Sequence, residues 1–345
     1  MSGEEDPWVE RARRPSGLSA EDAAQVAEGL CENRFPEDLA AELLRTMAAR
    51  GETTEELVGF ATTLRRLATP FDLVGASEGI DLCGTGGAPF PTFNVSTVAS
   101  FVVAASGAPV VKHGNSSLRG PCGSSDLLEA LGLPVKSSIA FARESFARES
   151  LAFLHAPLFH AATRQIAPVR KRLGTRTIFN LLGPLTNPAR PTHQLVGAFS
   201  AEYARMAVEV LPRLGCEHVL AVHGDDGSDE PSPQQPSSFF RWDAHGLSIE
   251  RTEPTDLLRP EETQGEWGPL APASAAEETR KILSGGTASA RAGAVLLAAG
   301  GALWIMGRAD DLAEGVSAAR ETVRAGRALS KLESLCALAQ MRSWT

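Results

Sequence analysis

The chain of 345 residues is 43% hydrophobic and 22% charged, which is the composition of a folded globular protein rather than of a disordered one. Its formal net charge of −9 argues against a general nucleic-acid binder, because such proteins usually present a basic face. The five cysteines form no CxxC pair and the N-terminus lacks the apolar segment of a signal peptide. We therefore expect a cytoplasmic protein that binds neither nucleic acid nor a membrane.

Residues 18–70 are predicted to form a group of helices. Ser19 precedes an amphipathic segment and can cap it, because a serine side chain accepts a hydrogen bond from the first turn of a helix. Residues 38–49 place leucines at helical spacing, Gly51 ends that pattern, and residues 53–57 begin another helix. The N-terminal part is therefore expected to be a small helical domain.

After residue 79, short apolar runs alternate with helical patterns, which indicates a large α/β domain with a mostly parallel central sheet. The runs that predict strands are residues 79–83, 109–112, 177–180, 194–199 and 219–223. The patterns that predict helices cover residues 98–106, 124–131, 201–214, 274–283 and 290–338. Residues 224–245 are rich in Gly, Pro, Ser and Asp, which predicts a long polar loop.

The stretch GTGGAPFPTFNVST, residues 84–97, joins the first of these strands to the helix that follows it. A glycine-rich turn of this kind directs backbone N–H groups and a helix N-terminus at one point, which favours phosphate. Asn94, Ser96 and Thr97 add side-chain donors. The pattern matches neither the GxGxxG fingerprint of dinucleotide-binding proteins nor the GxxxxGK[ST] of P-loops. A tight turn followed by a helix cap explains the same residues without a ligand.

Residues 112–126 begin at the last residue of the second predicted strand and combine a cation, an amide and several hydroxyls. Open α/β sheets bind ligands at this edge. Lys112 can supply a point charge to a phosphate, and Ser124 begins a helix whose N-terminus suits an anion. Taken singly, Lys112 is also compatible with a solvated strand end, and His113 with a packed, hydrogen-bonded core residue.

Two further stretches carry charge that can serve a ligand. APVRKRLGTRT places four cations within seven residues, beginning at Arg170, and an arginine can hold a carboxylate through two hydrogen bonds. Asp229 and Glu230 lie just past the strand predicted at residues 219–223, where adjacent carboxylates can hold Mg²⁺. Without context, a basic loop and a solvated acidic pair explain the same residues.

The order of these motifs resembles that of anthranilate phosphoribosyltransferases over about residues 18–340; the motifs are GTGG, TFNVST, KHGN, GSSD, APVRKRLGTRTIFNLLGPLTNP and the Asp229–Glu230 pair. The resemblance implies an α/β fold of the nucleoside phosphorylase/phosphoribosyltransferase type. It implies a helical domain at residues 1–75, joined by helices from about 165–190, and a catalytic domain at 76–345. The implied reaction, carried out by a homodimer, transfers phosphoribose from phosphoribosyl pyrophosphate (PRPP) to the amine of anthranilate in tryptophan biosynthesis.

The resemblance also assigns roles to individual positions. No covalent nucleophile is expected, because the aromatic amine supplies its own lone pair, and His113 is the one candidate for a direct catalytic role. The positions that correspond to PRPP-binding residues are Gly84, Gly87, Thr92, Asn94, Ser96, Thr97, Lys112 and Ser124. The positions that correspond to anthranilate-binding residues are Gly84, Asn115, His160 and Arg170. The positions that correspond to ligands of Mg²⁺, with two ions accompanying PRPP, are Ser96, Asp229 and Glu230.

Two positions depart from the family pattern. The family has Asp-Gly directly after GTGG, where this chain has Ala88-Pro89, so a carboxylate near PRPP and its metal is missing. The family has Arg after KHGN, where this chain has Ser116, and Arg119 is a candidate replacement for that cation. These changes predict weaker PRPP binding or an altered metal dependence. Two other functions stay open: transfer to a different aromatic acceptor, and a non-catalytic homologue that acts as a binding protein.

Overall fold

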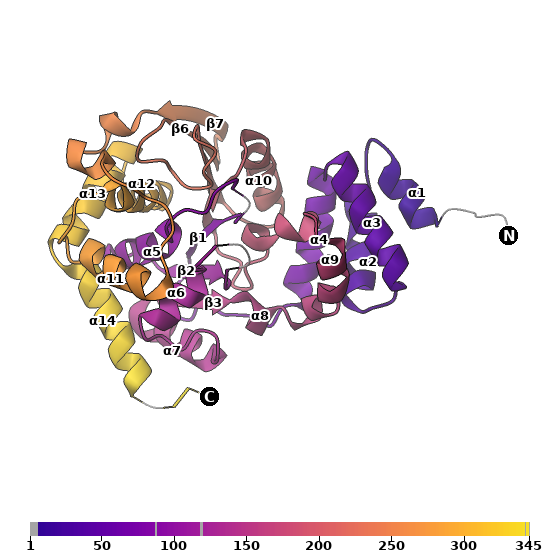
Figure 1. The fold of residues 1–345 in the computed structure, drawn as a ribbon, viewed down its shortest axis with the longest axis horizontal. Helices are drawn as coiled ribbons and strands as arrows, with labels where there is room; N and C mark the ends of the chain where they lie inside the picture. The colour runs from indigo at the N-terminus through magenta and orange to yellow at the C-terminus, as the bar shows by residue number, and fades with distance from the viewer. Residues whose placement is uncertain (1–5, 87, 118–119, 342, 345) are drawn as a thin grey trace.

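A helical bundle lies at one end of the molecule and a larger α/β part at the other (Figure 1). The computed structural model describes residues 6–86, 88–117, 120–341 and 343–344. The bundle contains four helices: α1 (Pro7–Arg13), α2 (Ala20–Cys31), α3 (Glu37–Arg50) and α4 (Thr54–Leu67). The prediction of helices across residues 18–70 is confirmed.

The bundle helices begin and end at the residues that local chemistry selects. The Ser19 hydroxyl accepts a hydrogen bond of 3.1 Å from the backbone N–H of Asp22. Thr53 and Glu56 form a reciprocal capping box at the start of α4, with backbone-to-side-chain distances of 3.2 and 2.9 Å. Gly51 follows α3 at φ 91°, a left-handed conformation that glycine adopts without steric cost.

Seven strands form one sheet in the order β3-β2-β1-β4-β5-β6-β7. The strands are β1 (Ile80–Gly84), β2 (Val110–Gly114), β3 (Leu151–His155), β4 (His193–Gly197), β5 (His218–Gly224), β6 (Ser237–Asp243) and β7 (Gly246–Thr252). The first five pair in parallel, and β6 and β7 are antiparallel. The carboxyl ends of the parallel strands therefore share one edge, which we call the carboxyl edge. We call the opposite edge the amino edge.

Alternating strand residues pack against different layers. In β5, Leu220 and Val222 belong to one hydrophobic cluster, and Val219 and Ala221 belong to another. The first cluster includes α5 (Val95–Ala105), α11 (Pro272–Leu283), α12 (Ala290–Ile305), α13 (Leu312–Arg324) and α14 (Arg327–Gln340). The second cluster continues through α10 (Ala201–Arg213) into the helical bundle. The remaining helices are α6 (Ser124–Ala130), α7 (Ile139–Glu149), α8 (Ala156–Phe159) and α9 (Ala167–Leu173).

The segment between β3 and β4 links the two parts of the molecule. Helix α9 packs against α3 of the bundle, and the Phe179 ring lies 5.8 Å from the Phe60 ring in an edge-to-face arrangement. Within the described residues, no helix combines the length and the hydropathy that crossing a bilayer requires.

Three details of the element prediction are wrong. Residues 177–180 are not a strand but contain the 3₁₀ turn η2 (Ile178–Asn180), which is buried against the bundle. Strand β3 was not predicted, because a short apolar run does not distinguish a strand from a buried helix. Residues 224–245 are not all loop, since they contain β6, whose pairing with β7 only the folded chain reveals.

Candidate active site

The glycine-rich turn after β1 is hydrogen-bonded to the acidic pair that lies far away in the sequence. The hydroxyl of Thr85 donates to the Oδ2 atom of Asp229 at 3.0 Å, and the backbone N–H of Gly86 donates to the same oxygen at 2.8 Å. Gly87 lies outside the described residues. The loop after β1 and the loop after β5 therefore form one structure at the carboxyl edge, as ligand sites of open α/β sheets do.

Two glycines allow the Asp229 backbone to approach the sheet. A Cβ atom on Gly197, the last residue of β4, would lie 1.8 Å from the backbone oxygen of Asp229. A Cβ atom on Gly84 would lie 3.4 Å from a carboxylate oxygen of the same residue. Sequence reasoning missed Gly197, although a glycine inside a predicted strand is a signal of close backbone approach. Only this close approach puts Asp229 within reach of the glycine turn.

Glu230 contacts the start of α5 and keeps one oxygen without a partner. Its Oε1 atom accepts a hydrogen bond of 3.3 Å from the backbone N–H of Ser96, whereas Oε2 is buried and unpaired among the described residues. Burial first, and then the neighbouring Asp229 charge, raise the pKa of Glu230 to about 8. A buried, unpaired carboxylate oxygen is costly unless a cation binds it.

The donor set at this point fits a hard cation. Two carboxylates and the Ser96 hydroxyl offer oxygen ligands, which Mg²⁺ prefers. No group of three or more His, Cys, Asp or Glu side chains within the described chain could hold a metal ion alone. A Mg²⁺ ion here would therefore take further oxygens from water or from a substrate phosphate, as Mg²⁺ commonly does.

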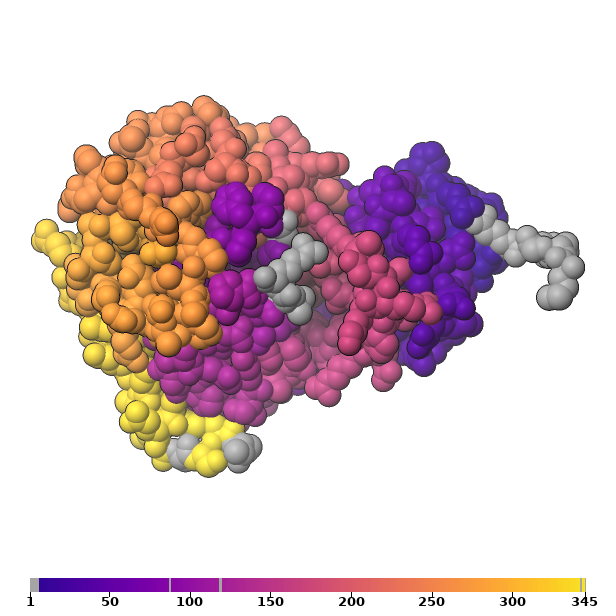
Figure 2. All heavy atoms as spheres, viewed as in Figure 1, coloured from indigo at the N-terminus to yellow at the C-terminus, as the bar shows by residue number. Residues whose placement is uncertain are grey.

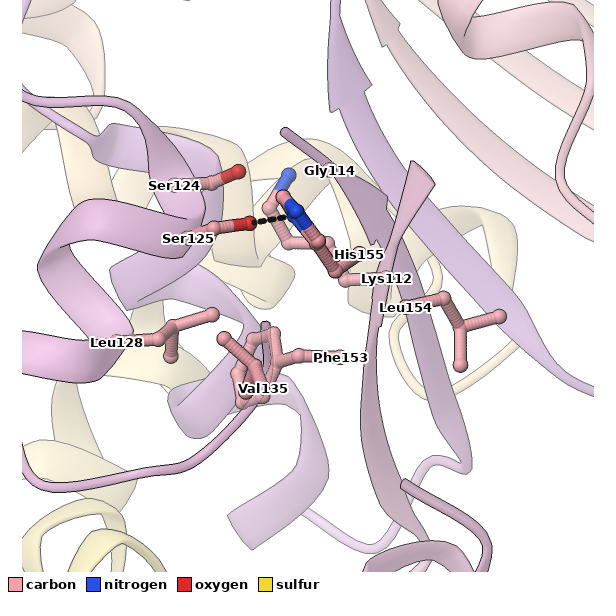
Figure 3. A pocket seen from close by; sticks show the side chains of 9 residues that line it. All are labelled: Lys112, Gly114, Ser124, Ser125, Leu128, Val135, Phe153, Leu154 and His155. Carbon is pink, nitrogen blue, oxygen red and sulfur yellow. Dashed lines mark hydrogen bonds between the residues drawn. The ribbon is translucent and has the colours of Figure 1, made fainter. Parts of the chain in front are cut away.

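Lys112 lies inside this site. Its ammonium donates to the Ser96 hydroxyl at 3.2 Å and to the backbone oxygen of Leu82, and its side chain is buried. The sequence places Lys112 against phosphate oxygens, and the structure places it between the Ser96–Glu230 contact and a small recess beside Ser124 (Figure 3). The lysine thus connects the candidate metal ligands with the candidate phosphate ligands.

The predicted phosphate-binding residues surround the start of α5. The Asn94 side-chain amide donates to the backbone oxygen of Cys122 at 3.1 Å, which ties this helix start to the loop after β2. Thr97 is buried in the first turn of α5, and its N–H donates to the Asn94 oxygen at 3.1 Å. Thr92 is partly exposed, and no hydrogen bond of its hydroxyl occurs within the described chain.

The loop after β2 is closed on itself. The Ser124 hydroxyl accepts from the N–H of Asn115 and donates to its backbone oxygen, both at 3.0 Å. The Asn115 side-chain oxygen accepts from the N–H of Ser116 at 2.8 Å. Arg119, the candidate replacement for the missing arginine, lies outside the described residues. Asn115 and Ser124 therefore contact each other, and Asn115 is exposed to solvent.

Arg170 presents an unpaired guanidinium from α9. The group lies 5.2 Å from the centre of the Phe179 ring, is partly buried, and forms no hydrogen bond or ion pair within the residues described. Burial lowers its pKa. By contrast, Arg172 on the same helix is paired with Asp38 at 3.1 Å. A partly buried arginine without a counter-ion fits a ligand carboxylate.

His113 and His160 face each other between the sheet and the bundle. Their ring centres lie 5.1 Å apart, and the Nδ1 atom of His113 lies 3.1 Å from the backbone oxygen of Gly183, in the 3₁₀ turn η3 (Gly183–Leu185). Burial lowers the pKa of His113 to about 3 and that of His160 to about 4, so both rings are neutral. The Nε2 atoms of both rings are buried and have no hydrogen-bond partner in the described chain, although the backbone of Thr186 and of Leu64 acts on the His160 ring and opposes the lowering of its pKa.

Asp81 and Asn187 hold His113 in place, and sequence reasoning missed both. Asp81 accepts the backbone N–H of His113 at 3.0 Å and the side-chain amide of Asn187 at 2.8 Å. Burial raises the pKa of Asp81 to about 6. A signal was available for Asp81, because a carboxylate inside an apolar strand requires a polar partner. The identity of that partner, about a hundred residues away, required the fold.

His155 also reaches the carboxyl edge and was not predicted. It ends β3, lies opposite Gly114 in the strand register, and its Nδ1 atom is 2.8 Å from the Ser125 hydroxyl (Figure 3). With β3 unrecognised, the sequence contained no signal for this residue.

Segments that carry several of these groups lie on one face of the molecule. In Figure 2 the purple chain near residue 90 and the pink chain of α9 lie on the same face, between the bulk of the α/β part and the indigo bundle. The structure brings Gly84, Ser96, Lys112, Asp229 and Glu230 together through direct contacts. It places Arg170, His113 and His160 on the bundle side of the sheet, and Asn115 in the loop that joins the two sides.

Comparisons with known proteins are consistent over nearly the whole chain. A family model described as "Glycosyl transferase family, a/b domain" matches residues 76–329, and one described as "Glycosyl transferase family, helical bundle domain" matches residues 7–68. An anthranilate phosphoribosyltransferase of Shouchella clausii is 40% identical over 326 residues, covering 92% of this chain and 93% of the relative. One of Salinibacter ruber is 38% identical over 327 residues, covering 94% and 95%.

Solved structures give the same result. The chain is similar to the anthranilate phosphoribosyltransferase of Thermus thermophilus, with a TM-score of 0.87, 35% identity, and coverage of 97% of this chain and 100% of that one. It also shares its fold with the Saccharomyces cerevisiae enzyme solved in complex with PRPP and Mg, with a TM-score of 0.84, 23% identity and 97% coverage of both chains.

Proposed function

The chain belongs to the anthranilate phosphoribosyltransferase family, and we propose on this basis that it transfers phosphoribose from PRPP to the amine of anthranilate. The products are N-(5-phosphoribosyl)anthranilate and pyrophosphate, and the reaction belongs to tryptophan biosynthesis. The observation that carries the proposal is identity of about 40% along more than nine tenths of both chains, together with a glycine turn joined to Asp229.

We propose that the carboxyl edge holds the diphosphate of PRPP. Asp229, Glu230 and the Ser96 hydroxyl would hold Mg²⁺, in two ions with PRPP, and the unpaired Oε2 atom of Glu230 supports this assignment. Bound Mg²⁺ neutralises charge that develops on the departing pyrophosphate. The residues proposed to line PRPP are Gly84, Gly87, Thr92, Asn94, Ser96, Thr97, Lys112 and Ser124. The Saccharomyces cerevisiae relative, solved with PRPP and Mg, supports the use of the metal.

We propose that anthranilate binds on the bundle side of the same edge. Arg170 would hold its carboxylate through two hydrogen bonds, because this guanidinium has no acidic partner within the described residues. Asn115, His160 and the backbone at Gly84 would complete the acceptor site. Positioning and electrostatic stabilisation are sufficient for such a transfer, since the amine needs no activation by a covalent intermediate.

Three further features are proposals from the family. The bundle at residues 1–75, joined by helices from about 165–190, would form one domain and residues 76–345 the catalytic domain; the packing of α9 against α3 supports this division. Two copies would form a homodimer through the bundle, and the protein would act in the cytoplasm on small molecules.

Two alternative functions lead to different results in one assay. A relative that uses another aromatic acceptor would release pyrophosphate from PRPP only with that acceptor, and a binding protein would not release it at all. The unpaired Arg170 favours an acceptor that carries a carboxylate, and the Asp229–Glu230 pair favours an enzyme over a binding protein.

Turnover can be followed by the loss of anthranilate fluorescence in the presence of PRPP and Mg²⁺. We expect consumption that requires all three components. Replacing both Asp229 and Glu230 by alanine should nearly abolish turnover at any Mg²⁺ concentration, because the cation loses both of its carboxylates. The matched control replaces Asp225 and Glu253, two exposed carboxylates paired with Arg251, and should retain full activity. Retained activity in the first variant would remove the acidic pair from the site.

A further inference from the structure

The two unpaired ring nitrogens on the bundle side of the carboxyl edge are unusual for a folded interior. Most buried polar atoms have a hydrogen-bond partner, because leaving one without a partner costs free energy. His113 and His160 are 4% and 6% exposed, and each keeps a buried Nε2 atom without a partner in the described chain. Their ring centres are 5.1 Å apart, so the two nitrogens belong to one location. Such a location fits a ligand that brings N–H groups.

The hydrogen bond to Gly183 determines which nitrogen of His113 carries the proton. A backbone carbonyl can only accept a hydrogen bond, so the Nδ1 atom, 3.1 Å from that oxygen, must be the donor. Burial holds the pKa of His113 near 3, and the ring is therefore neutral with a single proton. It follows that Nε2 carries a free lone pair and is a proton acceptor.

The surroundings fix the direction of this lone pair and keep the His113 ring neutral. Asp81 and Asn187 anchor the backbone of the residue, and Gly183 anchors the ring. The charged or titratable groups that act on the ring are His160, Lys112 and Arg65, all of which lower its pKa, and Asp81 accepts its backbone N–H. No carboxylate is hydrogen-bonded to the ring, so nothing in the described chain draws a second proton onto it.

Strand geometry places Nε2 of His113 on the side of the sheet opposite Lys112, which lies at the proposed diphosphate site. Successive residues of a strand point to opposite faces of the sheet, so Lys112 and His113 diverge at the end of β2. Lys112 reaches Ser96 and the α5 side, whereas His113 reaches Gly183 on the bundle side. In a displacement at C1 of the ribose, the nucleophile approaches from the face opposite the leaving group. The two side chains therefore lie on opposite sides of the sheet at its carboxyl edge, Lys112 on the side of the proposed diphosphate site and His113 on the side of the proposed acceptor site.

We propose that Nε2 of His113 accepts the proton that the amine of anthranilate loses when its nitrogen bonds to C1, an inference that rests on the proposed function. The amine lone pair forms the N–C1 bond, and the C1–O bond breaks with its electron pair leaving on pyrophosphate. An N–H bond of the resulting ammonium then breaks, its electrons stay on nitrogen, and the proton moves to Nε2. The imidazolium donates through Nδ1 to Gly183 and releases the proton to solvent after the products leave.

A weakly basic imidazole suffices for this step. An ammonium attached to an aromatic ring is a strong acid, because loss of its proton returns the lone pair to conjugation with the ring. The efficiency of general-base catalysis follows Brønsted behaviour, and an imidazole with a pKa near 3 is a weak base at physiological pH. The step therefore depends on the strong acidity of this ammonium and on the fixed position of Nε2. Because burial lowers the pKa of His113 to about 3, the ring is neutral and its Nε2 lone pair is free throughout the physiological pH range.

The test compares a substitution that removes proton acceptance at Nε2 with one that also removes the donor at Nδ1. His113→Asn keeps an N–H near the position of Nδ1 and removes Nε2, and His113→Gln places an amide near Nε2 that can accept a hydrogen bond but not a proton. We expect kcat to fall about 100-fold or more in both, with the KM for PRPP nearly unchanged, as for loss of a general base. His193→Asn, which removes a buried histidine at the amino edge, is the matched control and should retain the wild-type rate.

A measurement that needs no turnover tests the same assignment. In wild-type protein labelled with ¹⁵N-histidine, NMR should show His113 as the neutral form protonated on Nδ1, and its Nε2 resonance should shift when anthranilate is added. Finding the proton on Nε2, or a wild-type kcat in His113→Asn, would overturn the inference while leaving the proposed function standing. Wild-type protein that forms no product from anthranilate would instead overturn the proposed function and this inference with it.

Discussion

Each edge of the sheet carries a pair of neighbouring histidine rings, and the two pairs differ in what surrounds them. At the carboxyl edge, the His113 and His160 rings are tilted by 59°, and both Nε2 atoms are buried without a partner in the described chain. At the amino edge, the His193 and His218 rings stack 4.6 Å apart within 6° of parallel, and Nδ1 of His193 lies 2.9 Å from the Thr192 hydroxyl.

The charged groups follow the same division. At the amino edge Arg308 is paired with Glu78 at 3.0 Å, whereas Arg170 and the Oε2 atom of Glu230 lack partners among the described residues. Unsatisfied polar groups lower stability, and folded proteins keep them mainly where a ligand satisfies them. Residue type alone therefore does not identify the site. Buried unpaired atoms also occur elsewhere in the described chain, as on Gln194 and Trp304, so an unsatisfied group indicates a ligand only where several such groups meet at the carboxyl edge.

The largest effect is expected from closing the approach of Asp229 to the sheet. Gly197→Ala would place a Cβ atom 1.8 Å from the Asp229 backbone oxygen, so the acidic pair must move. We expect kcat/KM to fall at least about 100-fold, because a misplacement of about 1 Å costs that much in a preorganised site. Gly268→Ala is the control, since a Cβ atom there meets nothing within 4 Å. Equal activity of the two variants would mean that Asp229 needs no fixed position.

Removing the unpaired cation should affect one substrate only. We expect Arg170→Ala to raise the KM for anthranilate by about 10- to 100-fold, the effect of losing a charge-assisted hydrogen-bonded pair, with little change in the KM for PRPP. Arg172→Ala on the same helix removes a cation that already has a partner and should change neither constant. Steady-state kinetics with each substrate varied in turn gives the answer. An equal rise of both constants would contradict the assigned role.

The two histidine pairs should differ in how acid destabilises the protein. A histidine whose native pKa is lowered takes up its proton first in the unfolded chain, so the free energy of unfolding falls as the pH drops below about 6.5. For His160, with a pKa of about 4, this loss continues down to about pH 4. His160→Gln should reduce the slope by up to about 1.4 kcal/mol per pH unit.

His193→Gln should change the slope less, because Glu78 and Glu217 oppose the lowering of the His193 pKa that burial causes. Urea unfolding at pH 6.5, 5.5 and 4.5 measures both slopes. If the amino-edge variant flattened the pH dependence more than the carboxyl-edge variant, the contrast between the two pairs would be wrong.

The smallest effect is expected from returning a carboxylate to the glycine turn. Ala88→Asp restores the acid that the family pattern has directly after GTGG. Position 88 is close to the glycine turn, which donates a hydrogen bond to Asp229. We expect a few-fold lower KM for PRPP when Mg²⁺ is limiting, since an added carboxylate attracts the cation. Ala88→Asn has nearly the same shape without the charge and should leave the KM unchanged. No difference between the two variants would show that this position does not contact the metal-bound substrate.

Much of the fold was predictable because it depends on local pattern. The bundle helices follow from leucine spacing and from caps such as Ser19 and the Thr53–Glu56 box, which act within a few residues. The glycine turn, Lys112 and the Asp229–Glu230 pair were predicted because each lies at or just past the end of a predicted strand. Strand β3 and the β6–β7 pairing were missed, since short runs of apolar residues take their conformation from neighbours that are distant in sequence.

The sequence by itself determined which side chains are present and at which strand ends they occur, and its motifs determined the family. Only the tertiary structure decided which of them lack partners. Whether Glu230 and His113 remain unsatisfied depends on segments as remote as Ser96 and Gly183, and whether Asp229 reaches the glycine turn depends on the absence of a side chain at Gly197. Hydrogen bonds and steric contacts act through space over a few ångströms, so chemistry that arises from a missing partner cannot be read along the chain.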